Sequence, residues 1–137
     1  MIEGRERIAR YGALAKAYAQ AHRPQVKHYE WADRPDFSVF HGAPAVIVIS
    51  GRAGSPVAAS ECDRAGQNLA ISAHARGLGA CWVGSPNLWA RDPATRAELQ
   101  IPEAFEPHVV FALGHPTDQP AAPPPLTIRT IWIGDQA

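Results

Sequence analysis

The sequence has few cysteines and no net charge. Its 137 residues include two cysteines, and thirteen basic side chains balance thirteen acidic ones. Because no excess of positive charge attracts phosphate groups, we expect neither nucleic acid nor a membrane surface as a partner. No apolar run is long enough to span a bilayer. Cys62 and Cys81 stand among apolar residues, so we expect buried free thiols in a cytoplasmic protein rather than a disulfide.

The sequence also lacks the side-chain motifs of common hydrolases. It contains no H-E-x-x-H and no G-x-S-x-G, which argues against a zinc peptidase or a serine hydrolase of these types. The histidines do not have the spacing of metal ligands; they are His22, His28, His41, His74, His108 and His115. We therefore predict no metal site and no catalytic side chain. If the protein is an enzyme, a cofactor should carry the reactive chemistry.

The most informative stretch of the sequence runs from residue 55 to residue 85. Ser55 suits a helix N-cap, and Pro56 suits the first helical position. Apolar and small residues then recur at helical spacing until Gly77, which suits the left-handed residue that ends a helix. The pattern predicts a helix of about 21 residues, roughly 30 Å long. A buried strand is predicted directly after it, over residues 79–84.

This helix is unusually rich in small residues, and one of them is Gly66 in its interior. A glycine there costs about 1 kcal/mol relative to alanine, so we expect the missing side chain to serve a purpose. Close approach of another helix or of a sheet is one interpretation. A plain alanine-rich core helix is the other, and the pattern does not separate them.

The remaining elements follow from periodicity and from turn residues in a chain of single-domain size. Trp31, Phe37 and Phe40, in an irregular segment, could line a pocket or cover the core. The elements predicted outside 55–85 are an amphipathic helix at 5–22 that ends near residues 23–24, a surface loop or short irregular helix at 24–42, a central strand at 45–50 buried on both faces, a helix from Pro93 capped by Asp92, a strand at 108–114, a polyproline arm at 117–125 and a last strand at 126–133.

The turn from Gly51 to Ser55 joins a predicted strand to the long helix. Backbone N–H groups at such a position can hold a phosphate, so a phosphate- or nucleotide-binding domain is one functional hypothesis. The sequence has no G-x-x-x-x-G-K-[ST] and no G-x-G-x-x-G there, and glycine-rich strand-to-helix turns are common without a ligand.

Four segments, in this order and spacing, resemble the second half of the nitroreductase family of flavoproteins. They are GAPAVIVI at 42–49, DRAGQNLAISAHARGLGACWVG at 63–84, LQIPE at 99–103 and VVFALGHP at 109–116. The resemblance implies a single α+β domain over residues 1–137, shortened at its N-terminus, with a central mixed sheet flanked by helices. It also implies a homodimer that exchanges C-terminal strands, FMN at the subunit interface, and hydride transfer from NAD(P)H to small electrophiles such as nitro compounds or quinones.

The same resemblance assigns a cofactor site. Trp82, Val83, Gly84 and Ser85 would lie along the flavin ring, where backbone next to glycine can approach closely and donate N–H groups to reduced flavin. Arg129 is the nearest candidate for the FMN phosphate. The basic Arg-x-Ser-x-Arg segment with which the family opens is missing. A flavin-free dimeric scaffold, or a partial protein without activity, is therefore the alternative to an FMN-dependent oxidoreductase.

Overall fold

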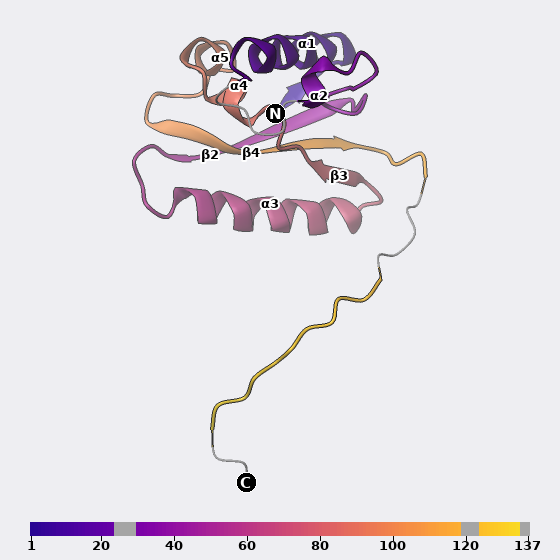
Figure 1. The fold of residues 1–137 in the computed structure, drawn as a ribbon, viewed down its shortest axis with the longest axis vertical. Coiled ribbons are helices and arrows are strands. Elements are labelled where there is room, and N and C mark those ends of the chain that lie inside the picture. The colour runs from indigo at the N-terminus through magenta and orange to yellow at the C-terminus, as the bar shows by residue number, and fades with distance from the viewer. Residues whose placement is uncertain (24–29, 119–123, 135–137) are drawn as a thin grey trace.

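The computed structural model describes residues 1–23, 30–118 and 124–134. Its elements in chain order are β1 (Ile2–Glu3), α1 (Arg5–Ala21), α2 (Glu30–Asp33), β2 (Ala45–Arg52), α3 (Ala58–His74), β3 (Gly79–Trp82), α4 (Asn87–Arg91), α5 (Pro93–Glu98) and β4 (Phe105–Gly114). The sheet forms the middle layer, with α3 on one face and α1, α2, α4 and α5 on the other (Figure 1). None of the helices within these ranges is long and apolar enough to cross a membrane.

The sheet has four strands in the order β1-β2-β4-β3, which confirms the predicted α+β class and the inner position of β2. All pairings among the described strands are antiparallel, so the predicted mixture of parallel and antiparallel strands is not found within them. β1 pairs only with Ala45 and Val46, which leaves the outer edge of β2 open from Ile47 onward. For this reason most side chains of β2 are half-buried, not buried on both faces as predicted.

The core lies on both sides of the sheet, because successive strand residues point to opposite faces. Val110 and Ala112 of β4 pack with Tyr11 and Trp89 under the four-helix layer. Val109 and Phe111 of β4 pack instead with Cys62 under α3, so one strand supplies both halves of the core. The alternation explains why β4 is the most deeply buried strand described.

The long helix begins later than predicted, because the strand before it stays attached to the sheet. Ala53 N–H donates to Ala104 O at 2.8 Å, and Gly54 then turns the chain with a φ of +73°. α3 starts at Ala58, so neither Ser55 nor Pro56 is in the helix. Its predicted end is confirmed, since Gly77 has a φ of +71°.

Gly66 faces the sheet of its own chain. A Cβ at this position would lie 2.9 Å from Phe111 Cε2 and 3.3 Å from Val109 Cγ1, both on β4. The predicted close approach is confirmed, and its partners are side chains of the sheet. Other small residues of α3, such as Ala59 and Ser72, remain exposed.

β3 is an edge strand, which corrects the prediction that it is buried. Trp82 is 47% exposed, and Cys81 is exposed as well. The prediction of two buried thiols is therefore right for Cys62 and wrong for Cys81. Burial is the main cause that raises the pKa of the Cys62 thiol, followed by the carboxylates of Asp63 and Glu61.

The C-terminal segment leaves the body of the protein, as Figure 1 shows for the yellow trace. Residues 126–133 form no strand in this single chain, although a strand was predicted there, because no other strand lies alongside. Five large apolar side chains of the segment are 70–98% exposed: Leu126, Ile128, Ile131, Trp132 and Ile133. Parts of the predicted arm and of the predicted loop at 24–42 lie outside the described residues.

Candidate functional site

The four residues predicted to lie along a flavin ring lie together where β3 ends. Val83 N–H donates to Val110 O at 2.8 Å, which extends the pairing with β4 by one residue. The Val83 side chain is 4% exposed and belongs to the core. The Val83 amide is therefore occupied within the protein, and the predicted role of this N–H as a donor to a ligand does not fit its geometry.

Gly84 differs from Val83 both in its amide and in the space beside its backbone. Within the described residues its N–H has no hydrogen-bond acceptor. A Cβ built on Gly84 would meet nothing within 4 Å, so the space beside its backbone is open. An unpaired amide next to open space is the arrangement that lets a planar group approach the main chain.

Trp82 and Ser85 flank this backbone. The Trp82 ring lies 5.7 Å from the ring of Phe111, tilted by 42°, and keeps 47% of its surface exposed. The Ser85 hydroxyl is buried and has no partner among the described residues, which makes it one of the few orphaned polar atoms of the structure. The strand end thus combines an exposed aromatic ring, a free amide and an unsatisfied hydroxyl.

Arg129 lies elsewhere in the single chain. It is exposed on the C-terminal segment that leads away from the body (Figure 1). The structure of one chain therefore brings Trp82, Val83, Gly84 and Ser85 together and does not bring Arg129 to them.

The glycines of the Gly51–Ser55 turn have structural explanations. A Cβ at Gly51 would lie 2.8 Å from Ala58 Cβ and 3.1 Å from Cys62 Sγ, so packing against α3 requires a glycine. Gly54 has the left-handed φ of +73° that favours glycine. Since both positions are needed by the fold, the turn carries no separate signal for phosphate.

Two cavities lie outside the strand end, and the first includes Phe37 and Phe40, two of the three aromatic residues that could line a pocket by the sequence analysis. One, of about 390 Å³, lies between α1 and residues 37–43. The other, of about 560 Å³, lies beside β3, with Cys81, His41 and His115 among its lining residues. Arg5 borders both cavities. Each cavity joins segments that are distant in sequence. The sequence signals for the first are the aromatic residues Phe37 and Phe40 and the small residues on one face of α1.

Comparison with known proteins gives a consistent picture. A putative NADH dehydrogenase/NAD(P)H nitroreductase of Methanothermobacter thermautotrophicus is 40% identical over 60 residues, which are 44% of this chain and 31% of that protein. The matched part thus spans less than a third of that relative.

Solved structures resemble the whole fold. A nitroreductase with bound FMN from Bacteroides fragilis superposes with a TM-score of 0.80 at 21% identity, covering 98% of this chain and 73% of that one. A nitroreductase with bound FMN from Desulfitobacterium hafniense gives a TM-score of 0.74 at 22% identity, covering 90% and 68%. At these identities the likeness concerns the fold. The profile of the nitroreductase family matches residues 3–115, most of the chain, and this protein therefore belongs to the nitroreductase family.

Proposed function

We propose that the protein is a cytoplasmic FMN-dependent oxidoreductase that uses NAD(P)H to reduce small electrophiles such as nitro compounds or quinones. The observation that carries this proposal is Gly84 at the end of β3, whose amide has no acceptor among the described residues and where a Cβ would meet nothing within 4 Å. Membership of the nitroreductase family supports it, as do the similar structures that contain FMN.

The residues at the strand end fit a flavin ring. Gly84 N–H would donate to the ring, and a donor at this place stabilises the negative charge of a reduced flavin. The exposed face of Trp82 would pack beside the ring, and the neighbouring Ser85 has a buried hydroxyl without a partner among the described residues. Bound FMN would supply the group that accepts a hydride from NAD(P)H and passes it on.

The exposed C-terminal segment supports a homodimer. Side chains as apolar as Ile131, Trp132 and Ile133 are seldom left 70–98% exposed unless a partner covers them. We propose that residues 126–133 of each copy add a strand to the other, which would also carry Arg129 toward the partner. A monodisperse monomer in light scattering at micromolar concentration would contradict this part of the proposal.

The first experiment asks whether the purified protein binds flavin. We expect a yellow protein, or one that turns yellow with added FMN, and release of FMN identified by its mass. Gly84→Val should abolish flavin binding while thermal unfolding stays close to that of the parent, because the new side chain would fill open space. Ala59→Val, at an exposed position of α3, is the matched control and should bind FMN normally.

The second experiment concerns the phosphate. Arg129→Ala should weaken FMN binding more than riboflavin binding, since FMN alone carries the phosphate, and added salt should reduce the difference. Equal losses for both ligands would remove Arg129 from the site. No flavin affinity in the parent, even with excess FMN, would favour the flavin-free scaffold or partial protein.

A further inference from the structure

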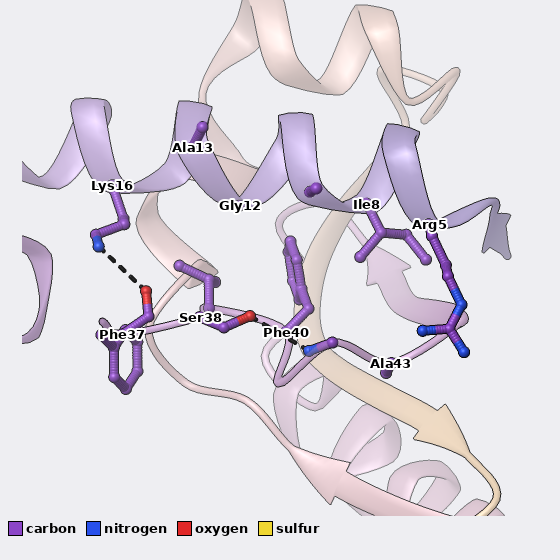
Figure 2. Close-up of a pocket in the computed structure, with 12 residues that line it drawn as sticks. Arg5, Ile8, Gly12, Ala13, Lys16, Phe37, Ser38, Phe40 and Ala43 are labelled. Atoms are coloured by element: carbon purple, nitrogen blue, oxygen red, sulfur yellow. Dashed lines mark hydrogen bonds between the residues drawn. The ribbon is translucent and has the colours of Figure 1, made fainter. Parts of the chain in front are cut away.

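The cavity between α1 and residues 37–43 is a built groove that the proposed flavin site does not include. None of Trp82, Val83, Gly84 and Ser85 borders it. Its volume of about 390 Å³ is in the range of small-molecule sites, which begins near 300 Å³. Figure 2 shows the groove with α1 along its upper side and the segment from Phe37 to Ala43 below.

The groove exists because one face of α1 carries small side chains. Ala9, Gly12 and Ala13 recur at helical spacing and leave a trough over the loop. The Phe40 ring rises toward Gly12 (Figure 2), where a Cβ would still be 3.7 Å from Phe40 Cδ2. Ile8 and Phe40 are each 3% exposed, so they form a closed apolar floor beneath the groove.

A cationic side chain lies near each end of the groove, and the two differ in how many of their hydrogen-bond donors are free. Lys16 Nζ donates to Arg34 O at 2.5 Å and to Phe37 O at 3.1 Å, which uses two of its three donor hydrogens. The Arg5 side chain has no hydrogen bond and no ion pair with any residue that the structure describes. Lys16 follows Arg5 by eleven residues, which is about 16 Å along the helix, so a small ligand reaches one end only.

We propose that this groove binds a small molecule with an apolar body and a single carboxylate, held by Arg5. The apolar body lies against the exposed Ala9 and Ala13 of α1, above the buried Ile8 and Phe40. The carboxylate accepts hydrogen bonds from the Arg5 guanidinium, whose planar fork matches it. Lys16 serves to hold the loop, because its ammonium is already bonded to two loop carbonyls. This site is independent of the flavin site.

The charge of the ligand is tested with 2-naphthoate and its neutral analogue 2-naphthylmethanol, titrated calorimetrically against the full chain. We expect saturable binding of 2-naphthoate and weaker binding of the alcohol. Arg5→Gln should lower the affinity for 2-naphthoate about tenfold, which is the effect of one charge-assisted hydrogen bond at an exposed site. Arg7→Gln, on the same helix but outside the groove, is the matched control and should bind like the parent. Arg5→Lys should retain part of the affinity.

The location is tested by filling the trough. Ala13→Leu should block 2-naphthoate, whereas Ala17→Leu, an exposed position of α1 that does not line the groove, should not. Three results would overturn the proposal: no saturable binding of 2-naphthoate, equal binding of the alcohol and the carboxylate, or no effect of Arg5→Gln. Competitive displacement of 2-naphthoate by FMN would likewise overturn it, because the groove would then belong to the flavin site. Failure of FMN to bind at all would leave these outcomes unchanged.

Discussion

The two helical glycines that face the core should respond in opposite directions to the same substitution. Gly12→Ala and Gly66→Ala each remove a flexible residue from a helix interior, which stabilises a helix by about 1 kcal/mol. At Gly12 the new methyl would sit 3.7 Å from Phe40 Cδ2, an ordinary contact. We therefore expect Gly12→Ala to raise the free energy of unfolding by about 1 kcal/mol.

At Gly66 the new methyl has no room. It would lie 2.9 Å from Phe111 Cε2, and Phe111 is 3% exposed and in contact with the Trp82 ring. Overpacking of this kind costs about 1 to 3 kcal/mol. Set against the gain of about 1 kcal/mol in helix propensity, Gly66→Ala should be neutral to destabilising by about 2 kcal/mol.

Urea denaturation at one fixed protein concentration measures both variants. The midpoints should differ by roughly 1 M, taking a difference of about 2 kcal/mol and an m-value of about 2 kcal/mol/M. In a Phe111→Leu background the cost of Gly66→Ala should shrink, because the shorter side chain leaves space for the methyl. If Gly66→Ala stabilises the protein as much as Gly12→Ala does, the sheet does not require a glycine and the packing argument is refuted.

Three further predictions concern local features. Asp92→Ala should lower the free energy of unfolding by about 1 kcal/mol in urea titrations, because the carboxylate accepts a backbone N–H of α5 at 3.1 Å. Iodoacetamide should label Cys81 in the folded protein and leave Cys62 unlabelled. The Cys62 thiol is covered because it is buried, and its raised pKa keeps it protonated. Mass spectrometry of peptides would locate the label. Arg34 lowers the pKa of Asp36 through a hydrogen bond and its charge, so Arg34→Gln should raise that pKa in an NMR titration. Any stability from this pair is present above the ordinary pKa of Asp36 and is lost as pH falls through its lowered value. An unchanged or lower pKa of Asp36 in the Arg34→Gln variant would contradict the assignment.

Several elements were predictable because their signals are local. The helix predicted at 5–22 follows from apolar spacing; it was expected to end near residues 23–24 and ends at Ala21. Asp92 caps α5 as predicted, and Gly77 ends α3. In each case neighbouring residues along the chain supply both the structure and the reason for it, so no knowledge of the tertiary fold is needed.

By itself the sequence determined the helices α1, α3 and α5, the strands β2, β3 and β4, the family resemblance and the candidate strand end at Trp82–Ser85. The tertiary structure alone decided that β3 lies at an edge, which exposes Cys81, because strand order depends on pairings between distant segments. It also decided that the Val83 amide is occupied and the Gly84 amide is free, since that depends on the register with β4. Phe37 and Phe40 were candidate pocket-lining residues, but the sequence could not show that the groove forms against α1 beside Arg5, because the loop follows that helix by more than fifteen residues.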